Sequence, residues 1–228
     1  MKINLIESFC NQYVGFVRVV AEDGSFGWGQ LSTYNADITQ QILHRQVAPW
    51  VLGREVSTPA MLDDTLDLVT EKEHKFPGSY LRRAMAGVDT AVWDLYGQQQ
   101  DKPVAALLGG SAGQVRAYAS SMKRDITPQD EAKRMCALRD KYGFDAFKVR
   151  AGAEVGRNQD EWPGRTEEII PTMRRAMGDK ASLLIDANSC YTPERAIEVG
   201  LLLQDQDKDH ILFHGQWVLQ QEVHIHVV

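Results

Sequence analysis

Two pairs of polar residues follow apolar segments in the second half of the chain, and their types suit metal and carboxylate chemistry. Asp186 and Asn188 end the apolar run 183–185, and Lys148 and Arg150 end the segment "FKVR". Each pair has i, i+2 spacing, which places both side chains on one face of a strand. Carboxylate and amide oxygens suit a hard divalent cation. Two cations suit a carboxylate anion, and a crowded lysine can lose its proton and act as a base, whereas an arginine does not readily do so.

Each pair also has a purely structural interpretation. Asp186 could cap the following loop or helix, and Lys148 and Arg150 could face solvent at a strand end. The coincidence of the two pairs favours a site, because neighbouring parallel strands would present both pairs at the same edge of a sheet.

The elements that must position these residues alternate between strands and helices. Strand segments are expected at 115–122, 146–149 and 183–185, and helices at 128–142, 165–177 and 193–203, with a polar loop at 151–164. Thr127 followed by Pro128 is typical of a helix N-terminus. Three successive βα units of about 30 residues predict parallel strands with right-handed crossovers.

The first ~110 residues have a different pattern. Residues 3–31 are typical of antiparallel strands joined by turns, and the segments 36–52, 58–72 and 79–99 have helical spacing, the last with an apolar stripe of Met85, Val88, Val92 and Leu95. The glycines of "GWGQ" (27–30) are interpreted as strand packing with a bulge, Asp89 and Asp94 as structural hydrogen-bonding residues, and "LLGGSAG" (107–113) as a domain junction.

Composition restricts the class of protein. The 228 residues are 43% hydrophobic and 25% charged, with a formal net charge of -6, so a packed core is expected and a nucleic acid partner is not. No segment has the ~18 apolar residues of a membrane span, and the N-terminus does not have the pattern of a signal peptide, which favours a cytoplasmic protein. The scattered cysteines Cys10, Cys136 and Cys190 are expected to be small core residues.

Three motifs, in their order and spacing, resemble the enolase superfamily, in particular its mandelate racemase and muconate lactonizing enzyme branch. They are "GWGQ", close to the family's GWGE, "AMAGVDTAVWDLYGQQQDKPVAALLGG" at 84–110, and "FKVR" with "LLIDAN" at 147–150 and 183–188. The resemblance extends over about residues 1–205.

The resemblance implies an α+β capping domain and a modified TIM barrel, with Mg²⁺ held by three carboxylates at successive strand ends. It also implies abstraction of the proton α to a carboxylate through a metal-stabilised enediolate. Asp186 matches the first metal ligand, Asn188 a substrate-facing amide, Lys148 a catalytic and substrate-binding cation, and Arg150 the catalytic position usually held by a basic lysine. Because arginine replaces that lysine, an acid-sugar dehydratase is favoured over a two-base racemase.

The same resemblance implies a small carboxylate or sugar-acid substrate, selected by capping-domain loops near residues 10–13 and 33–37. Self-association into a homo-oligomer is left open.

The sequence departs from the family after about residue 205. The Glu-Glu-Pro motif of the next strand is absent, and a closed barrel needs roughly 200 residues or more. We therefore expect a capping domain over 1–112, a partial, unclosed (β/α) barrel of about three units over 113–205, and an atypical tail over 206–228. The corresponding functional expectation is a chain that is inactive by itself; the alternative is a non-catalytic fragment or interaction protein.

Histidines gather in the tail, at positions 210, 214, 224 and 226. If 222–227 formed a strand, Glu222, His224 and His226 would share one face and could bind a metal. The alternatives are an amphipathic edge strand and a tail foreign to the family.

Overall fold

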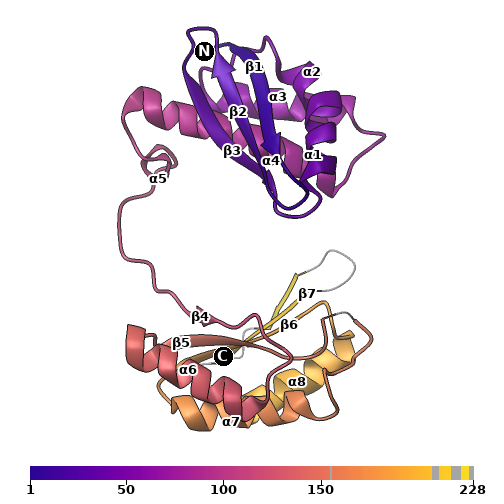
Figure 1. Ribbon diagram of the computed structural model, residues 1–228, viewed down its shortest axis with the longest axis vertical. Helices are drawn as coiled ribbons and strands as arrows, with labels where there is room; N and C mark the ends of the chain where they lie inside the picture. Colours follow the sequence, from indigo (N-terminus) through magenta and orange to yellow (C-terminus); the bar gives the residue numbers. More distant parts are fainter. Residues whose placement is uncertain (155, 207–210, 217–221, 226–228) are drawn as a thin grey trace. The chain divides into compact units, whose positions relative to one another are not determined.

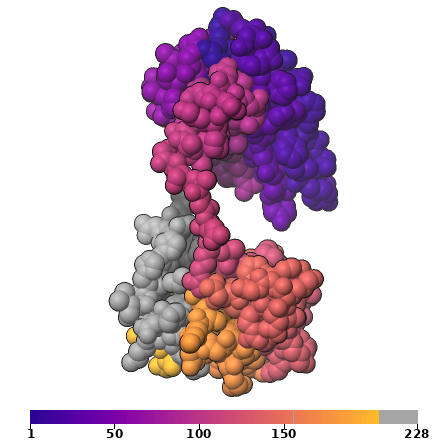
Figure 2. Space-filling model, turned by 90° about the vertical axis from the view of Figure 1, so that its left-hand side faces the viewer, coloured from indigo at the N-terminus to yellow at the C-terminus, as the bar shows by residue number. Residues whose placement is uncertain are grey.

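The structure is a computed structural model, and it describes residues 1–154, 156–206, 211–216 and 222–225. The chain divides into an N-terminal unit, Met1–Gly113, and a C-terminal unit, Gln114–Val228. Figure 1 labels the elements of each unit, and the colours of Figure 2 follow the same order along the sequence. Each unit is described by itself.

The N-terminal unit contains a three-stranded antiparallel sheet. Its strands are β1 (Ile3–Cys10), β2 (Gly15–Ala21) and β3 (Phe26–Ser32), in the order β1-β2-β3. Residues alternate between a buried face, with Val17 and Val19, and an exposed face, with Phe16. The register shifts where Gly15 pairs with Ser32 and Phe16 with Gln30, so one residue of β3 is bulged. The antiparallel meander predicted for 3–31 is therefore confirmed.

The helices of this unit are α1 (Ala36–Ile42), η1 (Leu43–Val47), α2 (Ala48–Val51), α3 (Pro59–Lys72), α4 (Ser79–Gln100) and α5 (Val104–Leu107). The helical spacing over 36–52 corresponds to a continuous helical segment in which a π-helical turn, η1, lies between α1 and α2. Pro49 in the following turn has no N–H to donate, and its ring would clash with the carbonyl of Arg45 in a regular α-helix.

Helix α4 lies against β3 at close range, and two glycines permit the approach (Figure 1). A Cβ atom on Gly27 would lie 2.0 Å from the Ala91 carbonyl oxygen, and one on Gly29 would lie 2.0 Å from the Gly87 carbonyl oxygen. The glycines of "GWGQ" are thus explained by packing. Asp94 of α4 accepts a hydrogen bond from the backbone N–H of Trp28 at 2.8 Å, which is the structural role expected of it.

The opposite face of this sheet exposes large apolar side chains. Trp28 is 40% exposed, and its ring centroid lies 5.5 Å from that of Phe9 and 6.4 Å from that of Phe26. The Arg18 guanidinium lies 5.3–5.9 Å from all three ring centroids and pairs with Glu7. The expectation of self-association stays a prediction.

The C-terminal unit is an open sheet with helices along one face (Figure 1). The strands β4 (Ala119–Ser120), β5 (Ala146–Arg150), β6 (Ser182–Asn188) and β7 (Ile211–Gln216) are parallel in this order, and β8 (Glu222–Ile225) pairs antiparallel with β7. The helices are α6 (Pro128–Tyr142), α7 (Arg165–Met177) and α8 (Pro193–Gln206). A capping domain followed by a partial, unclosed βα sheet is the predicted fold class, which is confirmed.

The core of the C-terminal unit fixes the direction of the polar strand residues. Phe147 and Val149 are buried in one cluster with helix residues such as Met135 and Ile169. Because side chains alternate along a strand, Lys148 and Arg150 point to the sheet face away from the helices.

Three details differ from the sequence expectations. The strand expected at 115–122 is limited to Ala119–Ser120, and Val115 is 90% exposed. Of the cysteines, Cys190 is buried and Cys136 is partly buried against the same core, whereas Cys10 is partly buried outside both cores, so the core interpretation was wrong for Cys10. In addition, β7 extends the parallel sheet into the segment expected to be a tail.

The predicted histidine face falls largely outside the described residues. His210 and His226 are not described, and β8 places His224 opposite His214 in backbone register. The metal-binding interpretation stays a prediction.

Helix α6 begins as its sequence predicts, and its N-cap gives a testable stability difference. The Thr127 hydroxyl accepts from the Asp130 N–H at 3.2 Å and donates to an Asp130 carboxylate oxygen at 2.8 Å. Thr127→Ala should lower the free energy of unfolding by about 1 kcal/mol in urea titrations, because the helix loses this cap. Thr90→Ala is the control. Thr90 is exposed within α4, and its hydroxyl donates to the Ala86 carbonyl oxygen of the same helix, so the free energy of unfolding should hardly change. Equal losses in both variants would contradict the capping role.

Candidate functional site

The backbone register of β5 and β6 brings the two predicted polar pairs together. Arg150 pairs with Asp186 at the carboxyl ends of these parallel strands, and Lys148 lies two residues earlier on the same face of β5. Asp186 is 2% exposed and Arg150 6% exposed, so the charged groups meet in a buried position. The predicted cluster of Lys148, Arg150, Asp186 and Asn188 is therefore present in the structure.

Asp186 is the centre of this cluster. Its Oδ2 accepts hydrogen bonds from Lys148 Nζ at 2.8 Å and from Arg150 Nη1, and its Oδ1 accepts from the Asn188 N–H at 2.9 Å. Burial acts to raise the pKa of Asp186, but the hydrogen bonds from Lys148 and the Asn188 N–H, with the charges of Arg150 and Lys148, hold that pKa below its ordinary value. Asp186 is consequently an ionised carboxylate at neutral pH.

Asn188 ends β6 in a left-handed backbone conformation, with φ 48°. Asparagine tolerates this region better than most residues, and here its own N–H reaches back to Asp186. Its Oδ1 accepts from Arg150 Nη1 at 2.7 Å and from Arg124 Nη2 at 2.5 Å. The amide oxygen therefore already has two donors from the protein.

Arg124 is the site residue that the sequence interpretation missed. It lies in the loop between β4 and α6, four residues beyond Ser120, and its guanidinium joins the cluster through Asn188. One signal was available, because Arg124 follows the first strand of the βα series at the same sheet edge as the other pairs.

Lys148 and Arg150 have different surroundings. The Lys148 Nζ lies 5.7 Å from the Tyr118 ring centroid, and its side chain is 14% exposed. Arg150 Nη2 lies 3.1 Å from the Met122 sulfur, and the Arg150 carbonyl oxygen accepts from the buried Arg165 at 2.9 Å. Arg150 is thus held on all sides by protein groups.

Of the residues in this cluster, Asp186 is suited to be one ligand of a Mg²⁺ ion. Asp186 offers an ionised carboxylate whose Oδ1 has a single protein donor and so retains a lone pair, which is the chemistry Mg²⁺ requires. Within the described ranges, no group of three or more His, Cys, Asp or Glu side chains could hold a metal ion. The second and third carboxylates implied by the resemblance have no counterpart among these residues.

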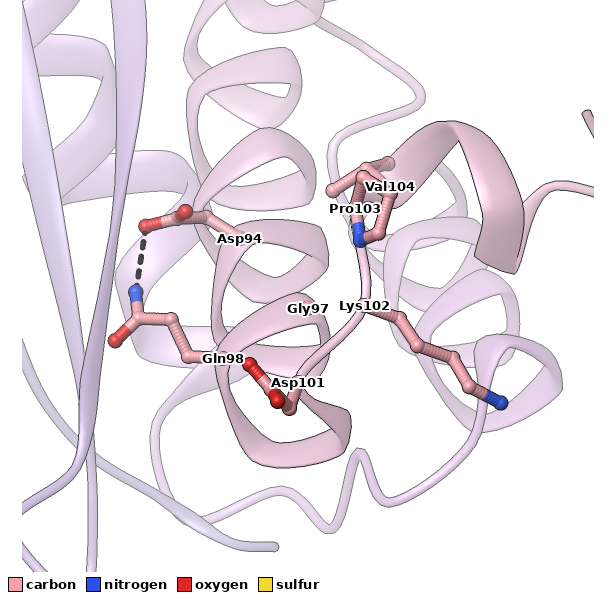
Figure 3. A pocket seen from close by; sticks show the side chains of 7 residues that line it. All are labelled: Asp94, Gly97, Gln98, Asp101, Lys102, Pro103 and Val104. Atoms are coloured by element: carbon pink, nitrogen blue, oxygen red, sulfur yellow. Dashed lines mark hydrogen bonds between the residues drawn. The ribbon is translucent and has the colours of Figure 1, made fainter. Parts of the chain in front are cut away.

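Two cavities lie in the N-terminal unit. One, of about 350 Å³, is lined by residues at the end of α4 and the start of α5, and Asp94 accepts there from the Gln98 amide (Figure 3). The other, of about 250 Å³, is lined by Ser32, Thr33 and Arg83 among others, beside the predicted specificity loop 33–37. The role of loops 10–13 and 33–37 in substrate selection stays a prediction.

Among the described residues, no helix has the length and apolar character needed to cross a bilayer.

The fold has two parts, an α+β unit and a unit of βα repeats that carries charged groups at its strand ends. Residues 4–109 match the mandelate racemase / muconate lactonizing enzyme N-terminal domain, and residues 130–211 match the enolase C-terminal domain-like family. The chain belongs to the mandelate racemase and muconate lactonizing enzyme branch of the enolase superfamily.

Relatives with assigned activities include an arabinonate dehydratase from Saccharolobus solfataricus, 30% identical over 197 residues, covering 82% of this chain and 48% of that protein. Other relatives are a cycloisomerase and an epimerase. The chain spans about half the length of the curated relatives it matches.

Solved structures give the same assignment. A candidate racemase from Roseobacter denitrificans has a TM-score of 0.88 and 71% identity, covering 92% of this chain and 57% of that one. A mandelate racemase/muconate lactonizing protein from Paracoccus denitrificans, solved with magnesium, has a TM-score of 0.78 and 26% identity, covering 90% of this chain and 56% of that one.

Proposed function

We propose that this chain is part of a Mg²⁺-dependent enzyme that abstracts the proton α to the carboxylate of a sugar acid, with dehydration as the overall reaction. The observation that carries the proposal is the buried cluster of Lys148, Arg150, Asp186 and Asn188 at the carboxyl ends of two paired parallel strands. The arabinonate dehydratase among the relatives supports the substrate class.

Each residue has a role that follows from its contacts. Asp186 is ionised and would ligate the metal, and the metal, when bound, would supply positive charge that stabilises the negative charge developing on the substrate carboxylate. Lys148 has an exposed fraction and two further N–H hydrogens, so it can bind the substrate carboxylate or exchange a proton with the substrate. Arg150 directs both Nη1 hydrogens to protein oxygens, and a guanidinium does not readily give up a proton, so this residue is unsuited to act as a base.

The absence of a base at position 150 bears on the reaction type. A two-base racemase needs a proton acceptor on each face of the substrate, and Arg150 occupies the position where the resemblance places the lysine of one face. A dehydratase needs one base for the α-proton and an acid for the leaving hydroxyl, so this substitution leaves dehydration feasible.

We also infer that the 228 residues bind substrate without turning it over, because the described residues supply one metal carboxylate. The test is calorimetric titration of the purified chain with D-arabinonate and D-galactonate in Mg²⁺, alongside a dehydration assay. Lys148→Met should weaken binding roughly tenfold or more, the loss expected for a charge-assisted hydrogen bond. Lys133→Met is the matched control, since the Lys133 side chain is 79% exposed on α6.

Two results would contradict these proposals. If the wild-type chain bound neither acid, the substrate class would be wrong. If it dehydrated a sugar acid with Mg²⁺, and Asp186→Ala abolished the reaction, the inference that the chain does not turn over substrate would be wrong.

A further inference from the structure

The site contains three cationic side chains, Lys148, Arg150 and Arg124. They differ in how many of their N–H donors are hydrogen-bonded to protein acceptors. Arg150 directs both hydrogens of Nη1 to protein oxygens, one to Asp186 and one to Asn188, and its Nη2 faces the Met122 sulfur. Its Nε is buried without a hydrogen-bond partner among the described residues. Arg150 therefore acts as a positioning residue that fixes Asp186 and Asn188, and it has little capacity left for a substrate.

Arg124, in contrast to Arg150, has few hydrogen-bond partners in the described part of the chain. Its one side-chain hydrogen bond in the described part of the chain runs from Nη2 to Asn188 Oδ1, and no carboxylate in that part forms an ion pair with it. Within the described residues, this half-buried guanidinium has five N–H donors, one neutral acceptor and a buried Nε without a hydrogen-bond partner, so it retains free donors and has no paired carboxylate there.

Among the described side chains, the hydrogen-bonded cluster at this sheet edge contains more cations than acids. Lys148, Arg150 and Arg124 are joined by hydrogen bonds to one carboxylate, Asp186, and one amide, Asn188. Glu131 forms a two-oxygen pair with Arg134, and Asp160 accepts from Thr166. Both carboxylates also act electrostatically on the buried Arg165, which donates to the Arg150 carbonyl oxygen.

We propose that Arg124 is a specificity-determining residue that binds a second acidic group, so that the site prefers dicarboxylic sugar acids to monocarboxylic ones. The inference rests on the proposed function, because it takes Lys148 as the cation for the reacting carboxylate. In the chain of hydrogen bonds Lys148 contacts Asp186 at one end and Arg124 contacts Asn188 at the other, with Arg150 between them. A diacid would neutralise both outer cations, whereas a monoacid would leave one of them desolvated and uncompensated.

The test uses two ligands with the same carbon skeleton. D-galactarate and D-galactonate differ at C6, where the first has a carboxylate and the second a hydroxymethyl group, and both C1 carboxylates are ionised at pH 7.5. Calorimetric titration of the wild-type chain in Mg²⁺ should give at least tenfold tighter binding of D-galactarate. Because the second contact is ionic, the preference should shrink as NaCl is raised from 50 to 500 mM.

Substitution of Arg124 should remove the preference selectively. Arg124→Gln should weaken D-galactarate at least tenfold while D-galactonate changes less than about twofold, and Arg124→Lys should restore part of the preference. Lys123→Gln is the matched control, since it removes the same charge from the neighbouring exposed residue. Circular dichroism melting curves would show whether each variant remains folded.

The outcomes separate the two proposals. Equal wild-type affinities for the two acids, or equal weakening of both by Arg124→Gln, would overturn the role of Arg124 and leave the proposed function standing. Binding of neither acid by the wild-type chain would overturn the proposed function and this inference with it.

Discussion

Asp186→Ala should lower the free energy of unfolding of the C-terminal unit by about 3–5 kcal/mol, the loss typical when one partner of a buried ion pair is removed. The carboxylate is 2% exposed and accepts from both Lys148 and Arg150, whose side chains are 14% and 7% exposed. Without it, two buried cations face each other with no anion between them. Hydrogen exchange of the β5 and β6 amides, combined with urea unfolding, measures the effect in this unit.

The comparison variant is Asp140→Ala. Asp140 forms a surface pair with Arg139 and is 67% exposed, so its loss should change stability by less than about 1 kcal/mol. If Asp186→Ala were as stable as Asp140→Ala, the cluster would not be a structural ion pair. A large loss would mean that the activity of Asp186→Ala has to be measured at temperatures where the variant is folded.

The same ion pair has a defined pH dependence. The pKa of Asp186 is lower in the folded chain than in the unfolded one, so its stabilising contribution is complete above the unfolded pKa and disappears as pH falls through the folded pKa. The stability gap between wild type and Asp186→Ala should therefore narrow in acid.

Gly29→Ala should destabilise the N-terminal unit by at least about 3 kcal/mol, at the upper end of the range for overpacked cores. The added Cβ would lie 2.0 Å from the Gly87 carbonyl oxygen and 3.0 Å from the Ala91 nitrogen, both backbone atoms of α4. A backbone atom cannot rotate away as a side chain can, so β3 and α4 must separate along their shared face. Urea unfolding with exchange of the β2 and β3 amides measures the loss.

Gly113→Ala is the control for the glycine substitution itself. Gly113 has open space around its Cα and no left-handed φ. Alanine there should leave stability unchanged or raise it slightly, because alanine lowers the conformational entropy of the unfolded chain. A Gly29→Ala variant within 1 kcal/mol of Gly113→Ala would show that α4 does not approach β3 this closely.

The main polar cluster was predictable because it depends on two regular features. Side chains two apart on a strand share a face, and parallel strands end at the same sheet edge, so Lys148, Arg150 and Asp186 had to converge if β5 and β6 were neighbours. The close packing of α4 on β3 was only half predictable, since the glycines of "GWGQ" indicated strand packing without indicating its partner.

The features that were missed depend on tertiary contacts. Arg124 lies in a loop, where no periodicity specifies the direction of a side chain. The π-helical turn covers only Leu43–Val47, which is too short for its own period to be recognised in the pattern of apolar residues. The segment expected as a strand over 115–122 pairs with β5 only at Ala119 and Ser120, whereas strand composition alone extended it to eight residues.

The ion pairs of Asp186 also bear on whether folding of the C-terminal unit would depend on a bound metal. Many small metal-binding domains are unfolded until the ion arrives, because their ligands repel one another or lack partners. Here Lys148 and Arg150 act as resident counter-ions for the acid, so the strands can assemble around it with no metal present. If Mg²⁺ binds Asp186 as proposed, the folding of these strands would therefore not depend on the metal.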